Sequence, residues 1–306
     1  MTHGAPGMRR DMRVLVTGWP SFVHGEATAG DVLSMSRVCD ALASAGIPHD
    51  TAWSPAFRSD ALHLDDADSQ RYSHLVFVCG PAHGEQVRFL HERYANCRRI
   101  AVGVSVLDPA DAAVTGFHRV LPRDGLSTAR PDMAVAASTV TVPVVGVAFA
   151  PGQAEYGTAR RHGSVHRALM RWLCDLDCAR LPLDTRLASD DWRHCRTPDQ
   201  LASVFSRLDA VVTTRLHGLV LGLRAGVPVL AVDPIAGGGK VTAQAGALDW
   251  PALVSAEQTA DAGAFAHWWR WCLSSEGRDR ARRREFPAAD ALTRELLDEL
   301  LTGRPA

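Results

Sequence analysis

The chain has 306 residues, of which 46% are hydrophobic and 22% charged; this balance excludes a disordered or fibrous protein and suits two domains. Its 33 basic and 34 acidic residues give a formal net charge of -1, which argues against a nucleic-acid binder that works by charge alone. No apolar run approaches the ~20 residues that span a bilayer, and the polar N-terminus lacks the apolar core of a signal peptide.

The seven cysteines are an odd number without C-x-x-C spacing, and the histidines show no metal-ligand spacing. We therefore expect reduced thiols, a cytoplasmic protein and no metal site.

Short apolar runs alternate with helical periodicity along the chain. Strands are expected near 14–17, 47–53, 75–79 and 100–107, with helices near 31–45 and 86–94. A second series has strands near 140–149, 210–213 and 227–232, with helices near 158–174 and 218–225.

The two series predict an α/β protein with two doubly wound, Rossmann-like parallel-sheet domains, 1–138 and 139–275. A charged helix is expected over 276–306, and the N-terminal domain is one surface on which it could pack. Ligands of such sheets bind beyond the carboxyl ends of the strands, so the active site is expected in the cleft between the domains.

Lys240 is the only lysine among the 33 basic residues, and it follows three consecutive glycines. An ammonium is a compact charge on a flexible stem, whereas a guanidinium is a broad planar fork. A site that accepts only the compact charge would explain the lysine; chance is the alternative.

The segment from Asp209 to Gly218 carries the most chemistry. A buried strand ends at Thr213 and a helix begins a few residues later, which places Arg215 and His217 at a helix N-terminus. Such a junction suits an anion such as phosphate or carboxylate. The alternative is an arginine paired to a local acid and a histidine that caps the helix.

Lys240 follows the next strand, and we expect it at the same sheet edge. The amides of residues 237–239 could also face an anion there. The loop is not a Walker A motif, because Val241 follows the lysine and Pro234 stands at the first glycine position.

These residues resemble the polysaccharide pyruvyl transferase family. The resemblance rests on Asp209-Ala210, the Arg215-Leu216-His217 element, the Ala225-Gly226-Val227-Pro228-Val229 turn and the downstream lysine. Gly30-Asp31, the apolar strand Leu75 to Gly80, Arg123-Asp124 with Ser127, and Pro131-Asp132-Met133-Ala134 add to it, so that it spans about residues 14–250.

The resemblance implies a fold like the glycosyltransferase B class and an enzyme that moves pyruvate from phosphoenolpyruvate to a sugar-like acceptor as a ketal. It needs no cofactor beyond that donor. Arg215, Lys240, Gly218, Gly238 and Gly239 are the candidate donor-binding residues, with Arg123 and His83 as further substrate contacts.

Proton transfer is the other task of the site. His217 is the candidate general acid, because an imidazole titrates near working pH. Asp31 could orient or deprotonate the acceptor hydroxyl; a cap of the first helix is its alternative role.

Two other functions fit the same segments. A sugar-nucleotide glycosyltransferase is one, although the helix over 219–224 carries no acid to hold ribose hydroxyls. A catalytically inactive binding protein is the other, although the charged candidates are intact. The acceptor, the choice between a ketal and a single-bond product, and a homodimer all stay open.

Overall fold

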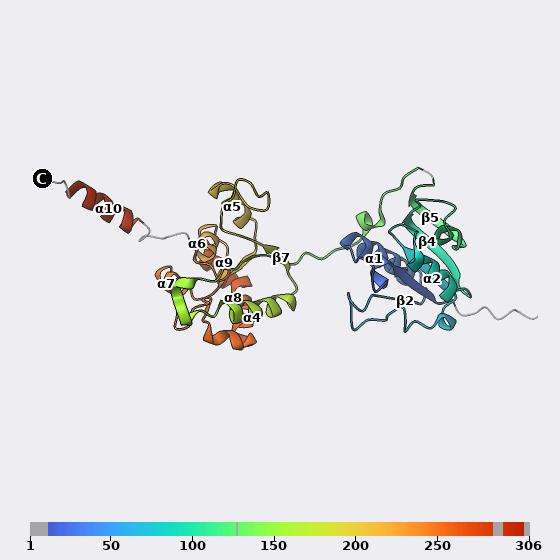
Figure 1. Ribbon diagram of the computed structural model, residues 1–306, viewed down its shortest axis with the longest axis horizontal. Coiled ribbons are helices and arrows are strands. Elements are labelled where there is room, and N and C mark those ends of the chain that lie inside the picture. Colours follow the sequence, from blue (N-terminus) through green and yellow to red (C-terminus); the bar gives the residue numbers. More distant parts are fainter. Residues whose placement is uncertain (1–11, 127, 284–289, 303–306) are drawn as a thin grey trace, which may run out of the picture. The chain divides into compact units, whose positions relative to one another are not determined.

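The computed structural model describes residues 12–126, 128–283 and 290–302 (Figure 1). By their internal contacts, the residues divide into two compact units, Met1–Val140 (unit 1) and Thr141–Ala306 (unit 2). Each unit is described by itself.

Unit 1 is a parallel sheet with strand order β2-β1-β3-β4-β5. Its strands and α-helices are β1 (Val14–Gly18), α1 (Ala29–Ser44), β2 (His49–Thr51), β3 (His74–Val78), α2 (Glu85–Arg93), β4 (Arg98–Ser105), α3 (Ala112–Thr115) and β5 (Arg119–Asp124).

The connections of unit 1 place its helices on both faces of the sheet. The step from β1 to β2 runs one way across the sheet, and the steps from β3 to β5 run the other way. Right-handed crossovers therefore put α1 on one face and α2 and α3, which contact each other, on the opposite face. Strand β1 serves both, because Val14 and Val16 pack with Met35 of α1 while Leu15 joins the other core.

Unit 2 repeats this topology with strand order β10-β9-β8-β6-β7, again parallel throughout the named strands. Its elements are β6 (Val144–Ala148), α4 (His162–Cys174), β7 (Ala179–Pro182), α5 (Pro198–Phe205), β8 (Ala210–Thr213), α6 (Leu216–Arg224), β9 (Val229–Val232), α7 (Lys240–Ala247), β10 (Leu253–Val254), α8 (Ala262–Leu273), α9 (Ser275–Arg282) and α10 (Ala291–Thr302).

The core of unit 2 lies around its central strands. Every residue of β8 and β9 is buried. Helices α5, α6 and α7 form one contacting series, and α4 contacts α8. The same handedness rule puts α4 on the face opposite α5 to α7. The prediction of an α/β protein built on two parallel sheets is confirmed.

Two predicted elements differ in extent. The helix expected from 158 begins at His162, because Ala154–Ala159 forms a 3₁₀ segment interrupted at Gly157, whose φ is 49°. The single helix expected over 276–306 is wrong. Helix α9 ends at Arg282, the next residue Arg283 has an extended backbone, and α10 begins at Ala291. Residues 284–289 lie outside the described residues.

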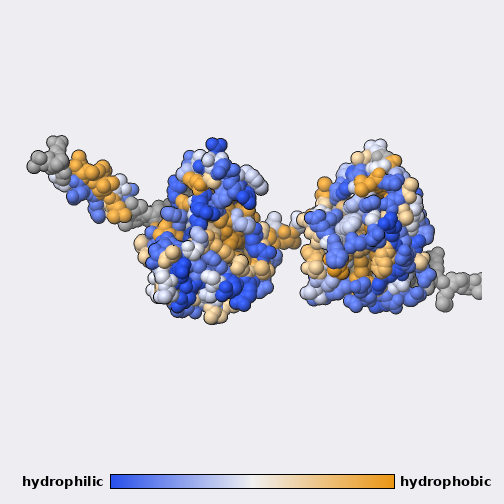
Figure 2. All heavy atoms as spheres, in the orientation of Figure 1, coloured by the Kyte–Doolittle hydropathy of each residue, from blue (hydrophilic) through white to orange (hydrophobic). Residues whose placement is uncertain are grey.

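Helix α10 is amphipathic and has no buried residue. Its leucines form an apolar stripe, which is visible in orange in Figure 2. The exposed residues of the stripe are Leu292, Leu296, Leu297, Leu300 and Leu301. Packing of this segment on the N-terminal domain stays a prediction.

Candidate active site

The sheet of unit 2 changes direction at β6, which has β7 on one side and β8 on the other. In doubly wound sheets, ligands bind at this topological switch point, where the strand order reverses, beyond the carboxyl ends of the strands. A cavity of about 530 Å³ lies here. Its walls come from the residues that follow β6, β7 and β8 and from the first turns of α4, and they include Phe149, Asp184, Arg186, Arg215, His162 and His166.

Arg215 is fixed at the junction between β8 and α6, where it is the N-cap residue of the helix. Its Nε donates to the carbonyl of Phe149 at 2.9 Å, and its Nη1 donates to Thr185 Oγ1 at 2.9 Å and lies 3.2 Å from Asp184 Oδ1. The side chain is only 14% exposed. Within the described ranges Nη2 has no protein acceptor, so this end of the guanidinium is available to a ligand in the cavity.

Asp184 lies between two arginines. Arg186 donates to its Oδ2 from Nε and Nη2 at 2.9 and 2.6 Å. Burial alone would raise the pKa of Asp184, but the hydrogen bonds from the side chain and amide of Arg186 and the charge of Arg215 outweigh it and lower the pKa to about 2. Two guanidinium groups therefore face one carboxylate, and the balance of charge at this wall is positive.

An aromatic wall closes another side of the cavity. The rings of Phe149 and His166 stack with centroids 4.8 Å apart. His166 Nε2 lies 3.2 Å from Thr214 Oγ1, which also accepts the amide of Ala150 at 2.8 Å. Burial and the neighbouring His162 lower the pKa of His166, so the wall is neutral around pH 7.

His217 and Gly218 lie in the first turn of α6. His217 is exposed and is outside the lining of the cavity. Gly218 is buried against β8: a Cβ at this position would lie 2.1 Å from Thr213 Oγ1. The structure therefore gives Gly218 a packing role, which lets α6 begin directly above the strand.

The loop over residues 236–239 (the glycine loop) does not present free amides as the sequence predicts. Asp233, fully buried after β9, accepts the amides of Ile235, Gly239 and Thr242 at 2.7–3.0 Å. The amide of Gly237 donates to Glu257 Oε1, and that of Gly238 donates to the carbonyl of Ile235.

The amides of Gly238 and Gly239, expected to face an anion, thus have protein acceptors already. The prediction that these amides bind an anion is therefore corrected: the buried carboxylate of Asp233 accepts hydrogen bonds from the loop and holds its backbone in place. The sequence could not show that Asp233 folds back beneath the glycines.

Lys240 begins α7 and is exposed. It does not line the cavity, but it is near enough for its charge to lower the pKa of His162, which does line it. Of the three predicted cationic or imidazole groups, the structure thus places Arg215 on the cavity, and His217 and Lys240 at the surface outside its lining.

In unit 1, Arg123 belongs to a polar network at the carboxyl ends of β3 to β5. It donates to Asp124 at 3.0 Å, to Asp132 at 2.5 Å and to Ser105 Oγ at 2.7 Å. These carboxylates raise the pKa of Arg123. Asp132 also accepts from Ser34 of α1 at 3.0 Å, so the network ties β5 to the first helix.

The other two predicted residues of unit 1 have local partners. Thr28 caps α1 by accepting the amide of Asp31 at 3.2 Å, and its hydroxyl donates to the Asp31 carboxylate at 2.7 Å. Asp31 thus stands three residues after the cap. His83 Nδ1 lies 2.6 Å from Asp111 Oδ2, with the imidazole 59% exposed.

Sequence reasoning missed four residues of the cavity: His162, His166, Asp184 and Arg186. The i, i+4 spacing of the two histidines on a helix that follows a strand was visible. The Asp184-x-Arg186 pair gave no comparable sign, because it follows β7, an edge strand exposed at every position.

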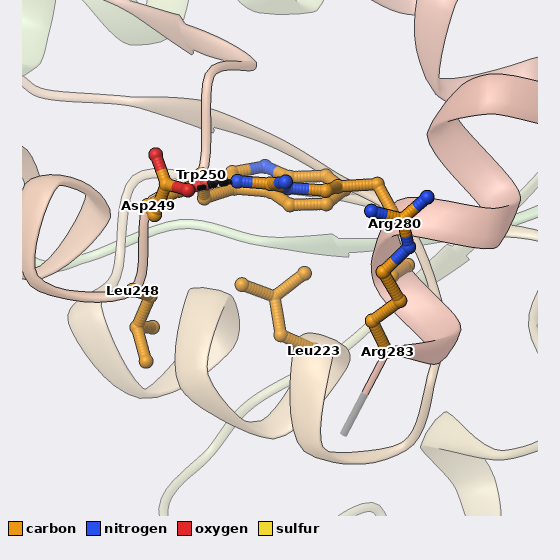
Figure 3. A pocket seen from close by; sticks show the side chains of 7 residues that line it. Leu223, Leu248, Asp249, Trp250, Arg280 and Arg283 are labelled. Carbon is orange, nitrogen blue, oxygen red and sulfur yellow. Dashed lines mark hydrogen bonds and ion pairs between the residues drawn. The ribbon is translucent and has the colours of Figure 1, made fainter. Parts of the chain in front are cut away.

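A second cavity, of about 210 Å³, lies at the opposite edge of the unit 2 sheet (Figure 3). Leu223 and Leu248 line it from the carboxyl ends of α6 and α7, and the indole of Trp250 donates to the carbonyl of Val229, the first residue of β9. Arg280 is paired with Asp249. The strands begin at this end of the sheet, whereas ligands of doubly wound sheets bind where the strands end, so we assign no ligand site to this cavity.

One comparison concerns a segment that contributes part of this site. Residues 178–234 match the family model of the polysaccharide pyruvyl transferases. The match runs from the start of β7 to the end of β9 and includes Asp184, Arg215 and His217. The resemblance predicted from the sequence is thus confirmed over this part of the chain. No curated protein matches the chain.

Several solved structures are similar over most of their length. Spinosyn rhamnosyltransferase SpnG complexed with thymidine diphosphate is 13% identical, with 93% of this chain and 100% of that chain covered and a TM-score of 0.32. The glycosyltransferase SnogD from Streptomyces nogalater is 16% identical, with 95% and 99% covered and a TM-score of 0.30. Scores this low carry no inference about activity.

Two further observations concern the described residues only. No helix among them is long and apolar enough to cross a bilayer. Within the same ranges, no three His, Cys, Asp or Glu side chains gather in a way that could hold a metal ion.

Proposed function

We propose that the protein is a pyruvyl transferase that moves pyruvate from phosphoenolpyruvate to a sugar-like hydroxylated acceptor and releases phosphate. The observation that carries the proposal is the family match over residues 178–234, whose strand and helix junction positions Arg215 on the cavity at the topological switch point. The donor has a carboxylate and a phosphate. A cavity wall with two guanidinium groups and one carboxylate suits such an anion.

The chemistry requires a proton and two new bonds. A proton adds to the methylene carbon of the donor, and the resulting oxocarbenium-like carbon is attacked by one acceptor hydroxyl. A second hydroxyl then displaces the phosphate as the bond between that carbon and the phosphate oxygen breaks, and a ketal forms. Of the two protons that the hydroxyls lose, one restores the proton donor and the other leaves with the phosphate. His217 is kept as the proposed proton donor although it lies outside the lining of the cavity, because it is exposed in the first turn of α6, two residues after Arg215. Asp31 and His83 remain candidates for the acceptor side.

Phosphate release tests the reaction directly. The protein is incubated with phosphoenolpyruvate and a panel of sugars, glycolipid head groups and small polyols, and free phosphate is measured against a reaction without acceptor. We expect acceptor-dependent release that His217→Ala abolishes while calorimetric binding of the donor survives. Loss of binding in that variant would instead make His217 a binding residue.

The same preparation separates the alternatives. A thermal shift with UDP- or GDP-sugars but none with phosphoenolpyruvate would favour a glycosyltransferase. Donor binding without turnover of any acceptor would favour an inactive binding protein.

A further inference from the structure

His162 is a buried histidine whose ring has no hydrogen-bond partner among the described residues. The residue is 7% exposed, and neither ring nitrogen has a hydrogen-bond partner within the described chain. Burial of a polar group without a hydrogen bond is costly, so such groups are rare unless a ligand or water completes them. The ring lines the cavity at the switch point and also an adjoining hollow of about 380 Å³. The residue that carries the two unsatisfied nitrogens thus contributes to the walls of a ligand-sized space.

His162 is also the first residue of α4, a helix of 13 residues. Among the residues that the structure describes, no side chain caps this helix, and its first turn carries no acidic residue. The N–H groups of a first turn have no intrahelical acceptor and carry a partial positive charge. Gly163, the next residue, lines the same cavity, so this turn faces it.

Charged groups of both signs lie near His162. Arg160 and Lys240 lower the pKa of His162 in addition to its burial, whereas Asp233 and Glu155 act in the opposite sense. Asp233 is already saturated by the hydrogen bonds of the glycine loop. Arg215 faces the same cavity from β8. An imidazole donor, an uncapped helix start and a guanidinium therefore meet around one space.

We propose that His162 and the first turn of α4 form a phosphate-binding subsite, in which the imidazole and the free amides hold the phosphate group of a phosphomonoester or inorganic phosphate. The subsite does not depend on pyruvyl transfer. Under the proposed function it would hold the phosphate of the donor and of the product, and it would leave Arg215 for the carboxylate.

Gly163 offers a test that does not threaten the fold. A Cβ at this position meets only the end of the Arg167 side chain, at 3.6 Å, so a larger residue fits. Gly163→Asp puts a carboxylate in the first turn, where it stabilises the helix but repels an anion and competes for the amides. Gly163→Asn has the same shape without the charge and is the matched control. His162→Ala removes the imidazole, and His267→Ala, at an exposed position of α8, is its control.

The readout is calorimetric binding of inorganic phosphate and, separately, of phosphoenolpyruvate. We expect wild type, Gly163→Asn and His267→Ala to bind phosphate alike, His162→Ala to bind it about tenfold more weakly, and Gly163→Asp not to bind it. Melting temperatures confirm that the variants are folded. If wild type does not bind phosphate, or if His162→Ala and Gly163→Asp bind it as wild type does, the subsite is refuted.

The two phosphate sources and the two proposals are told apart in the same series. Weaker binding of phosphoenolpyruvate in the variants identifies the donor as an occupant, whereas an effect on inorganic phosphate alone limits the subsite to the product. Phosphate binding at His162 without acceptor-dependent turnover would refute pyruvyl transfer and keep the subsite. Turnover with unaltered phosphate binding in both variants would refute the subsite and keep the reaction.

Discussion

Lys240 tests whether charge shape matters at the rim of this site. It is the only lysine of the chain, begins α7 and lies close enough to act on the charge of His162. Lys240→Arg keeps the charge but replaces a compact ammonium by a planar fork. We expect phosphoenolpyruvate to bind about tenfold more weakly by calorimetry. Arg270→Lys, at an exposed position of α8, makes the reverse exchange and should change nothing. Wild-type affinity in Lys240→Arg would remove the lysine from the donor site.

Asp184 makes the stability of this region dependent on pH. Its pKa is lowered from 3.8 to about 2, against the effect of burial, chiefly by Arg186 and Arg215. A carboxyl with a lowered pKa stabilises the fold above its unfolded-state value, and this contribution disappears as the pH falls through the folded-state value. We expect the difference in unfolding free energy between wild type and Asp184→Asn, from urea titrations, to be constant above about pH 5 and to shrink as the pH falls from there toward about pH 1. Asp199→Asn, at an exposed position, is the control. A difference independent of pH would contradict the ion pairs described.

Helix α6 depends on the absence of a side chain at Gly218. Thr213 Oγ1, which a Cβ would meet at 2.1 Å, cannot withdraw, because it donates to the carbonyl of Ala148 at 2.8 Å and accepts the amide of Arg215 at 2.9 Å. Gly218→Ala should therefore cost about 1–3 kcal/mol of unfolding free energy and weaken donor binding by displacing Arg215. Gly246→Ala in α7, where nothing lies within 4 Å, should instead stabilise by roughly 0.5–1 kcal/mol. Equal effects of both variants in chemical denaturation would contradict this packing.

The sequence predicts the strands and helices whose buried residues form an apolar run or an apolar stripe of helical period. The apolar run at 210–213 coincides with β8, a central strand with no exposed residue, and helix α1 follows its apolar stripe to the glycine beyond its end. Strand β7 could not be predicted from the sequence, because an edge strand that is exposed at every position shows neither an apolar run nor an alternation of apolar and polar residues. Asp184 follows that strand, so the sequence allows a local acid beside Arg215 but does not identify which one.

The two units share one strand order but differ in what occupies the switch point of the sheet. In unit 1 the switch point lies between β1 and β3, and Trp19 occupies it: the indole donates to the carbonyl of Pro81 at 3.2 Å, and a Cβ on Gly80 would lie 2.1 Å from its ring. In unit 2 the equivalent place between β6 and β8 holds a cavity with arginines and histidines. This difference supports the proposal that unit 2 binds the anionic donor, and unit 1 with its Arg123 network is the candidate for the acceptor.

The connection between the units is an exposed segment without regular structure, over residues 137–143, in which Val140 is 90% exposed. Elastase, which cleaves after small apolar residues, should therefore cut here first. The competing exposed loop between β7 and α5 is tied to the rest of unit 2 by Arg215, which pairs with Asp184 and donates to Thr185, and within the loop the amide of Ala188 donates to the carbonyl of Cys195. We expect mass spectrometry of a time course to show two fragments that meet at the connection and then persist. A first cut inside the β7–α5 loop, or rapid loss of either fragment, would mean that the units do not fold as separate cores.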